Sequence, residues 1–223
     1  TGRPGPVLID IPMDLQRVKI DPKKLKSFKP SINKKIIKYR NIVAKIENLL
    51  RKSKKPVIIL GGGIKYGKAE LDLINFLKIF NIPIVTTWSG VDLIDHNNKN
   101  YIGNIGVYGS RAANFTVQNS DLILCLGTRL DTRITGGVPK SFARKAKKIV
   151  VDIDKFELNK KRGLKIDLKV ELDIKIFFQE YEKYNKEIII RDNWLLRCKD
   201  WKSRYPIILK KFNNIKKYVN PYV

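Results

Sequence analysis

Apolar residues along the chain alternate between short continuous runs and stretches with helical spacing. The continuous runs are typical of buried strands and comprise residues 7–11, 57–60, 82–86, 122–126 and 149–153. Apolar residues recur at helical spacing in residues 34–52 and 69–80, with lysines on the opposite face of the first stretch. The pattern therefore predicts strands that alternate with amphipathic helices.

Three polar residues predict where further helices begin. Ser110 can accept a hydrogen bond from the first turn of a helix that ends near residue 119. Asp154, with Glu157 three positions later, has the form of a capping box in which Asp replaces Ser or Thr, and Asp173 precedes another helical stretch. Together the elements predict an α/β fold, a three-layer doubly wound parallel sheet of about six strands. Ligands bind such sheets at the carboxyl ends of the strands.

The pattern also predicts how the chain is organised. Residues 34–184 are expected to form the α/β domain, since 223 residues with 43% hydrophobic content can bury one sizeable core. Residues 1–33, with a lysine- and proline-rich stretch at 21–31, are predicted to be a strand and linker from a preceding domain. Residues 185–223 are predicted to be a helical linker toward a following domain. The chain begins at Thr1 and ends just after Pro221, so we expect a piece of a longer protein.

One face of the predicted C-terminal helix carries two tryptophans. Trp194 and Trp201 are seven positions apart and therefore share a helix face. We expect this face to pack against a domain outside the chain.

The formal net charge of +25 raises the question of nucleic-acid binding. The lysines are spread through nearly every predicted helix and loop, and no aromatic RNA-binding run, zinc-finger spacing or GXXG clamp accompanies them. Specific nucleic-acid binding is therefore not expected, and a basic nucleic-acid-binding module stays as a lesser alternative. No apolar run approaches the roughly 18 residues of a membrane span, and no cleavable leader is evident, which predicts a soluble, cytoplasmic protein without membrane attachment.

The residues best known for catalysis and metal binding are scarce. The two cysteines, Cys125 and Cys198, lie far apart in a strand-like run and a charged helical stretch, which favours reduced thiols. The single histidine, His96, lies in a polar loop without candidate partners for a triad. Metal-ligand spacing is absent, so we expect no metal-binding residues in this chain.

Three consecutive glycines, Gly61, Gly62 and Gly63, directly follow a predicted strand. They permit a tight turn and a close approach of the backbone to a phosphate at the following helix start. Their spacing does not match G-x-G-x-x-G, and Thr86 and Thr87 stand where a ribose-binding carboxylate would end the next strand. An ordinary NAD site is thus disfavoured, and a purely structural glycine turn is the alternative.

Other predicted strand ends also carry glycines and charged residues, so several loops are expected to converge at one edge of the sheet. Arg129 and Arg133 flank Asp131 just past a buried strand, where two guanidinium groups can reach a diphosphate while Asp131 orients one of them. A surface ion-pair cluster is the alternative interpretation. Asp152, at another strand end, either accepts hydrogen bonds from ribose hydroxyls or caps the next helix.

Several segments, in their order and approximate spacing, resemble the large subunit of the acetolactate synthase family of thiamine-diphosphate enzymes. The match runs from residue 1 to about residue 178. The matching segments are residues 2–12 (GRPGPVLIDIP), 61–63, 82–87, 106–109, 113–114, 127–136 and 151–154.

The resemblance implies the Rossmann-like middle domain of these enzymes, which holds FAD or ADP in several members. It places diphosphate and ribose contacts on Arg3, Gly61, Gly62, Gly63, Arg129, Asp131 and Asp152. It places flavin contacts on Thr87, Trp88, Gly106, Val107, Tyr108, Arg133 and Ile134, and the adenine near Asp173. Met13, Thr132 and Leu172 depart from the family's usual residues, so FAD, ADP or neither, and the choice of substrate, stay open.

In the family, thiamine diphosphate and Mg²⁺ are held by two other domains, whose catalytic glutamate and Gly-Asp-Gly…Asn motif do not occur in this sequence. The resemblance implies a full-length carboligase of branched-chain amino acid biosynthesis. It would decarboxylate a 2-keto acid and pass the acyl-anion equivalent to a carbonyl acceptor. A homodimer or tetramer, with a regulatory subunit as a candidate partner, is implied too, and the chain alone is expected to be inactive. The alternative is a decarboxylase-like relative whose middle domain is purely structural.

Overall fold

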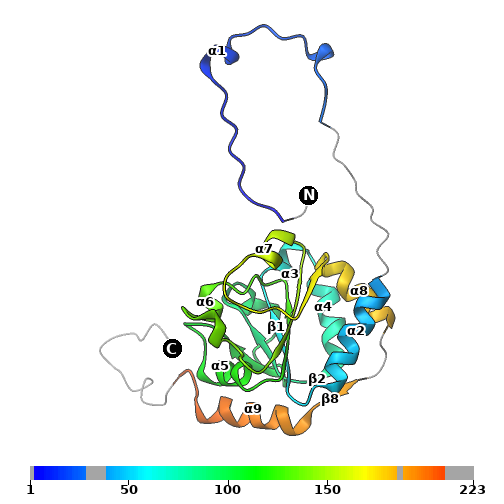
Figure 1. The fold of residues 1–223 in the computed structure, drawn as a ribbon, viewed down its shortest axis with the longest axis vertical. Helices are drawn as coiled ribbons and strands as arrows, with labels where there is room; N and C mark the ends of the chain where they lie inside the picture. The colour runs from blue at the N-terminus through cyan, green and yellow to red at the C-terminus, as the bar shows by residue number, and fades with distance from the viewer. Residues whose placement is uncertain (1–2, 29–38, 185–187, 209–223) are drawn as a thin grey trace, which may run out of the picture.

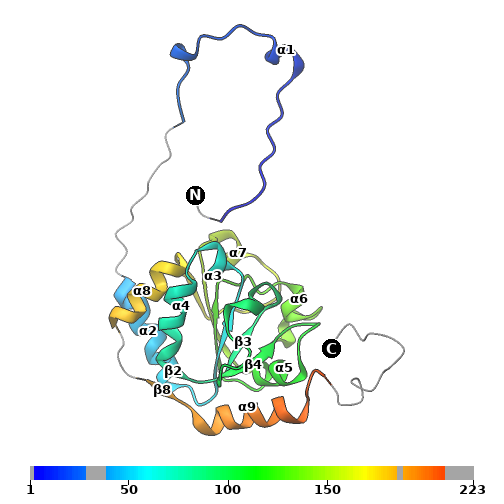
Figure 2. The ribbon, with the colours of Figure 1, turned by 180° about the vertical axis from the view of Figure 1, so that it is seen from behind.

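The computed structural model describes residues 3–28, 39–184 and 188–208. A parallel sheet of six strands lies at its centre (Figures 1 and 2). In spatial order the strands are β4 (Tyr101–Asn104), β3 (Ile84–Thr86), β1 (Pro56–Leu60), β5 (Leu122–Leu126), β6 (Lys147–Asp152) and β7 (Leu168–Glu171). The chain runs outward from β1 first on one side and then, from β5, on the other, which makes the sheet doubly wound. The predicted fold class is confirmed.

Helices cover both faces of the sheet and complete three layers (Figure 1). One face is covered by α2 (Tyr39–Lys52), α4 (Glu70–Lys78) and α8 (Ile174–Tyr184), and the other by α5 (Arg111–Gln118) and α9 (Asp192–Arg204). The shorter elements are α1 (Met13–Gln16), α3 (Gly63–Tyr66), α6 (Thr132–Thr135), α7 (Lys155–Asn159), η1 (Pro22–Lys24), η2 (Trp88–Leu93) and η3 (Pro139–Ser141). A separate parallel pair joins β2 (Phe80–Asn81) to β8 (Ile189–Ile190).

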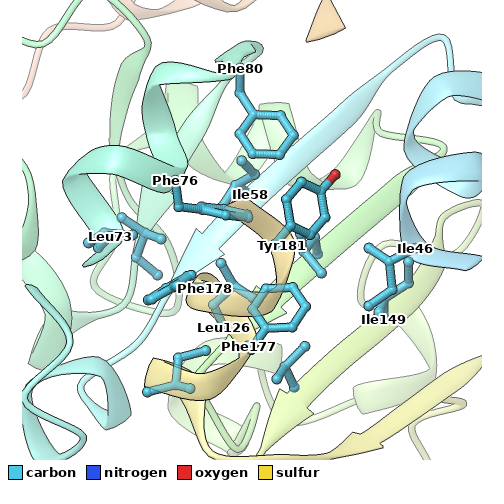
Figure 3. Close-up of a cluster of buried hydrophobic side chains, with 14 of the residues drawn as sticks. Ile46, Ile58, Leu73, Phe76, Phe80, Leu126, Ile149, Phe177, Phe178 and Tyr181 are labelled. Carbon is cyan, nitrogen blue, oxygen red and sulfur yellow. The ribbon is translucent and has the colours of Figure 1, made fainter. Parts of the chain in front are cut away.

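The strands are apolar throughout because both faces of the sheet are buried. In β1, Ile58 and Leu60 belong to the core under α2, α4 and α8, whereas Val57 and Ile59 belong to the core under α5 and α9. The first core is rich in aromatic rings, as Figure 3 shows. Its ring centroids lie 4.8 to 5.9 Å apart in tilted and edge-on pairs, a geometry that aromatic rings favour. These rings are Phe76, Phe80, Phe177, Phe178 and Tyr181.

The predicted strand at residues 7–11 is wrong. This segment is extended and exposed, with Leu8 92% accessible, and it pairs with no strand of the described chain. A strand needs a neighbour for its backbone hydrogen bonds, and an apolar run alone does not supply one. In the predicted linker at 21–31, Asp21 caps the short helix η1, while residues 29–31 lie outside the described residues.

Several element boundaries differ from the sequence pattern. The helix predicted over 69–80 ends at Lys78, because Phe80 and Asn81 pair with β8. The helix predicted from residue 34 is described only from Tyr39, so residues 34–38 lie outside the described part. The strand predicted over 82–86 begins at Ile84. The strand predicted over 149–153 corresponds to β6, which begins at Lys147 and ends at Asp152, and strands β4 and β7 were not predicted.

The predicted helix caps are present, with one correction. The Ser110 hydroxyl accepts a hydrogen bond from the backbone of Ala113 at the start of α5. Asp154 likewise accepts hydrogen bonds from the N–H groups of Phe156 and Glu157 at the start of α7. The Asp154 N–H donates to Asp152 instead of to Glu157, so the reciprocal half of the predicted capping box is not formed.

The C-terminal helix α9 packs on this domain itself. Trp194, Leu195 and Cys198 are buried in the core that α5 covers, and the Trp194 indole N–H donates to the Pro56 carbonyl at 3.0 Å. The Trp201 ring lies edge-on to Trp194. The expectation that these tryptophans pack against a domain outside the chain is therefore wrong, because the second face of the sheet requires this cover.

Both cysteines are buried free thiols, as predicted. Burial raises the pKa of Cys198 to about 12, and it also raises the pKa of Cys125. Among the residues that the structure describes, none lies in a helix with the length and apolar character needed to cross a membrane.

Candidate functional site

A cavity of about 560 Å³ lies at the carboxyl ends of the strands, at the edge of the sheet where α3 and α7 are found in Figure 1. Residues that follow each of the six strands line it, as expected for a doubly wound sheet. The loop after β1 contributes Gly62 and Gly63, and the loop after β5 contributes Arg129. The converging loops predicted from the sequence therefore meet at one place.

Twelve of the fifteen predicted site residues line this cavity. They are Arg3, Gly62, Gly63, Thr87, Trp88, Tyr108, Arg129, Asp131, Arg133, Ile134, Asp152 and Asp173. The other three, Gly61, Gly106 and Val107, are not among the residues that line it. The geometry thus brings most of the predicted set together, while their binding roles stay predictions.

Gly61 has a structural reason to be glycine. An added Cβ at Gly61 would lie 2.3 Å from the Gly127 carbonyl oxygen and 2.5 Å from the Thr128 Cβ. Gly127 itself has a φ of +61°, in the left-handed region that favours glycine. The ends of β1 and β5 can therefore approach each other only through glycine, while a binding role for Gly61 stays a prediction.

Gly62 and Gly63 differ from Gly61 because they face the cavity. The Gly63 N–H donates to the Gly127 carbonyl at 2.9 Å, so it is already used within the fold. The Gly62 N–H forms no hydrogen bond within the described part of the chain, which leaves it available to an anion at the start of α3.

Gly106 and Val107 contact the arginine-bearing loop at the Arg133 carbonyl. The Val107 N–H donates to the Arg133 carbonyl at 2.8 Å, and an added Cβ at Gly106 would lie 2.4 Å from that same carbonyl. The loop after β4 is thereby held against α6. The missing side chain at Gly106 permits this contact.

Arg129, Asp131 and Arg133 lie together just after β5, in contacts that fit both the predicted diphosphate site and the alternative of a surface ion-pair cluster. Arg129 Nε lies 3.3 Å from Asp131 Oδ2, while Asp131 Oδ1 accepts a hydrogen bond from the Arg133 N–H at the start of α6. Asp131 therefore orients one guanidinium group and fixes the backbone that carries the other. Within the described chain the Arg133 guanidinium forms no ion pair.

Arg3 brings the N-terminal segment to the same cavity. Its guanidinium lies 3.2 Å from Asp154 Oδ2 and 3.5 Å from Glu157 Oε1 at the start of α7. The hydrogen bond to Asp154 raises the pKa of Arg3. The group is therefore a permanent positive charge at the rim.

The two carboxyl oxygens of Asp152 have different surroundings. Its Oδ1 accepts the Asp154 N–H at 2.9 Å and so supports the cap of α7, while its Oδ2 forms no hydrogen bond with the described residues. Burial raises the pKa of this carboxyl, although the bond from Asp154 and the charge of Arg3 act in the opposite direction. Of the two roles considered for Asp152, the capping support is present, and one oxygen at the cavity is left for a ligand hydroxyl.

The chemistry of the lining changes along the sheet. At the β3 and β4 end, Trp88 and Tyr108 form an edge-on pair at 5.7 Å and are 64% and 77% exposed. The middle, at β1 and β5, carries glycines and Arg129. The β6 and β7 end carries Asp152 and Asp173, so aromatic, cationic and acidic surfaces succeed one another across the cavity.

Some lining residues were not predicted. They are Pro4, Tyr66, Gly67, Ser89, Asn104, Ile105, Gly127, Thr128, Ile153 and Ile174. Asn104 is the most polar of them, and its side-chain oxygen accepts hydrogen bonds from Tyr101 at 2.7 Å and Thr86 at 3.1 Å. The signal that would have found it is strand β4, since Asn104 is the last residue of that unpredicted strand.

Residues suited to other chemistries do not gather here. His96 is exposed in its loop, where its ring lies edge-on to Tyr101. Within the described ranges, no group of three or more His, Cys, Asp or Glu side chains is placed to hold a metal ion.

Comparisons with known proteins agree with this geometry. A family model described as "Thiamine pyrophosphate enzyme, central domain" matches residues 43–181. The probable acetolactate synthase large subunit of Methanococcus aeolicus is 35% identical over 199 residues, which is 86% of this chain and 32% of that protein.

Two further relatives carry similar names. The acetolactate synthase large subunit of Cyanidium caldarium is 34% identical over 92% of this chain and 37% of that protein. The acetolactate synthase isozyme 2 large subunit of Escherichia coli K12 is 35% identical over 78% of this chain and 31% of that protein. The chain spans about a third of the length of these relatives.

Proposed function

Because the chain belongs to the thiamine pyrophosphate enzyme central-domain family, we propose that it is the nucleotide-binding middle domain of an acetolactate synthase-like carboligase. The observation that carries the proposal is the order of surfaces across the cavity, from an aromatic pair through arginines and a free backbone N–H to carboxylates. An extended FAD presents a ring system, a diphosphate and an adenosine in the same order. ADP would occupy the cationic and acidic parts alone.

The residues present fit such a ligand. Arg129 and Arg133 would bind the diphosphate together with the Gly62 N–H, since guanidinium groups and helix starts both favour phosphate oxygens. Asp152 would accept a hydrogen bond from a ribose hydroxyl, and Trp88 would pack on a flavin ring. The nucleotide would supply no step of the carboligation. It would stabilise the domain by tying together the loops that follow the six strands.

The chemistry of the whole enzyme is part of the same proposal. Other domains would hold thiamine diphosphate and Mg²⁺, and the whole enzyme would decarboxylate a 2-keto acid and transfer the acyl-anion equivalent to a carbonyl acceptor. The relatives are named large subunits, which supports a regulatory small subunit as a partner within a homodimer or tetramer. Two buried free thiols fit a reducing compartment such as the cytoplasm.

A purely structural middle domain is the competing function. It would be favoured by side chains that fill the groove above Gly62 and Gly63, whereas both glycines line the cavity here. An added Cβ would nevertheless lie 2.8 Å from Ser89 Oγ at Gly62 and 2.7 Å from the Gly127 carbonyl oxygen at Gly63, so both positions also have a structural reason to be glycine. The lesser alternative, a specific nucleic-acid module, lacks support from the family match.

Calorimetric titration of the chain with FAD, ADP and riboflavin tests the proposal. We expect FAD or ADP to bind at one site. Arg129→Gln/Arg133→Gln should weaken that binding by about tenfold or more, since hydrogen bonds to charged groups contribute about 1.5–3 kcal/mol. The matched control is Lys45→Gln/Lys52→Gln, which removes the same charge from exposed positions of α2.

The ligands separate the alternatives. If Trp88→Ala weakens the binding of FAD but not of ADP, the ligand is FAD. If Trp88→Ala changes the affinity for neither nucleotide, the site is of the ADP type. Absence of binding by both nucleotides at millimolar concentration would contradict the proposal and leave the structural domain. A full-length protein that releases carbon dioxide from a 2-keto acid without thiamine diphosphate would contradict the proposed reaction.

A further inference from the structure

A second cavity, of about 350 Å³, lies at the opposite edge of the sheet, at the amino ends of β6 and β7. It is formed by the loop that follows η3, the start of β6 and the loop that precedes β7. Its lining residues are Pro139, Lys140, Phe142, Arg144, Lys145, Ala146, Lys147, Lys148, Gly163, Leu164, Lys165 and Asp167. None of the residues proposed to bind a nucleotide contributes to it.

Positive charge is concentrated in this second cavity beyond the general excess of the chain. Six of its twelve lining residues are Lys or Arg, compared with 46 of 223 in the whole sequence. The single carboxylate, Asp167, is already engaged, because Oδ2 accepts the Lys148 N–H at 2.9 Å and Oδ1 lies 3.2 Å from Lys165 Nζ. Most of the positive charge is therefore not neutralised from within.

Four of the six cationic side chains, those of Lys140, Arg144, Lys145 and Lys147, are exposed and form no ion pair with any residue that the structure describes. Like charges at close range repel one another, so such a cluster is stabilised by an anion among its members.

The loop that carries two of these cations is held in a fixed shape. Ala143 has a φ of +44°, a conformation that is strained for alanine and persists where the surroundings impose it. Here the buried Lys148 Nζ donates to the carbonyls of Ala143 and Ala146 at 2.8 and 2.9 Å, and Gln118 accepts the Ala143 N–H. Arg144 and Lys145 follow this anchored residue directly, so their backbone is ordered before any ligand arrives.

We propose that the second cavity binds a small phosphate-bearing anion. A guanidinium group beside several ammonium groups is the donor set that phosphate oxygens favour, and the volume is at the lower end of small-molecule pockets. The apolar side chains of Phe142 and Leu164 close part of the lining, which limits the ligand to a compact molecule. The basic residues of this cavity gather around a volume of about 350 Å³, whereas a nucleic acid needs an extended basic stripe.

The site is tested with two probes, inorganic pyrophosphate and fructose 1,6-bisphosphate, which represent free phosphate and phosphate esters. Calorimetry is performed on the full chain carrying Arg129→Gln/Arg133→Gln, so that the cavity at the carboxyl edge contributes little phosphate binding. Into this background we introduce Arg144→Gln/Lys145→Gln, and as matched control Lys45→Gln/Lys52→Gln. Arg144 and Lys145 are exposed and donate no side-chain hydrogen bond to the described residues, so the fold should persist, which circular dichroism checks.

We expect at least one probe to bind, and Arg144→Gln/Lys145→Gln to weaken it by about tenfold or more while the control leaves it nearly unchanged. Preference for the bisphosphate identifies an ester ligand, and preference for pyrophosphate identifies an inorganic one. Equal weakening by both double variants, or no binding of either probe, would overturn the proposal. Binding of a short DNA duplex that depends on Arg144 and Lys145, without dependence for the small probes, would overturn it in favour of a nucleic-acid surface.

Discussion

The close approach of β1 and β5 can be tested by adding one methyl group. In Gly61→Ala the new Cβ would lie 2.3 Å from the Gly127 carbonyl oxygen, well inside van der Waals contact. Two of the three nearest atoms belong to the backbone and the third is the Thr128 Cβ, so no side-chain rotation relieves the overlap and the two strand ends must separate. Overpacking of this kind lowers the free energy of unfolding by about 1–3 kcal/mol.

The assay is urea unfolding followed by circular dichroism, with thermal unfolding as a second readout. For a chain of this size each kcal/mol lowers Tm by about 2–4 °C. Gly137→Ala is the control, because an added Cβ there meets no atom within 4 Å, and it should change stability by less than about 0.5 kcal/mol. If Gly61→Ala and Gly137→Ala unfold at the same urea concentration, the strand ends are not held together as described and the structural role of Gly61 is refuted.

Three further experiments test other parts of the structure. Asp154→Ala removes the cap of α7 and the contact with Arg3. The free energy of unfolding, measured in urea at neutral pH, should therefore fall by about 0.5–2 kcal/mol. Burial raises the pKa of Asp154, but its hydrogen bonds outweigh this and lower it. The parent should therefore exceed the variant in free energy of unfolding by the full amount above the unfolded pKa of about 3.9. This excess should disappear as the pH falls through the lower pKa of the folded state. An excess that persists in acid contradicts the assignment. Cys125 and Cys198 should resist disulfide reagents at mildly alkaline pH until urea unfolds the chain, and rapid labelling of the folded chain would show that they are not buried. Trp194→Ala should lower the free energy of unfolding by about 3–5 kcal/mol, and parental stability would show that α9 is dispensable to the domain.

The central strands could be predicted from the sequence because a strand that is buried on both faces is apolar at every position. Strand β5 reads as a continuous apolar run, and it is buried at every position. Strand β7, at the edge of the sheet, exposes Lys169 and Glu171, and its polar residues resemble those of a loop. Strand β4 contains Gly103 and Asn104, both of which weaken a strand pattern.

The wrong predictions concern what covers an apolar surface. The run at residues 7–11 and the helix face that carries Trp194 are both apolar, yet the first is exposed and the second is buried. Sequence periodicity identifies an apolar face but does not identify its partner. More of the cavity lining was predicted, because the family resemblance pointed to residues at the strand ends, while Asn104 was missed together with its strand.

Arg3 couples the position of the N-terminal segment to ligand binding in the cavity. Residues 3–28 are exposed, and Arg3 makes the described salt bridges of this segment to the domain, through Asp154 and Glu157. Any anion that draws this guanidinium group toward itself changes how firmly the segment is held, and by reciprocity the position of the segment changes the anion's affinity. A neighbouring domain or a force that displaces the segment would thus change the affinity of the cavity for its ligand through the position of Arg3.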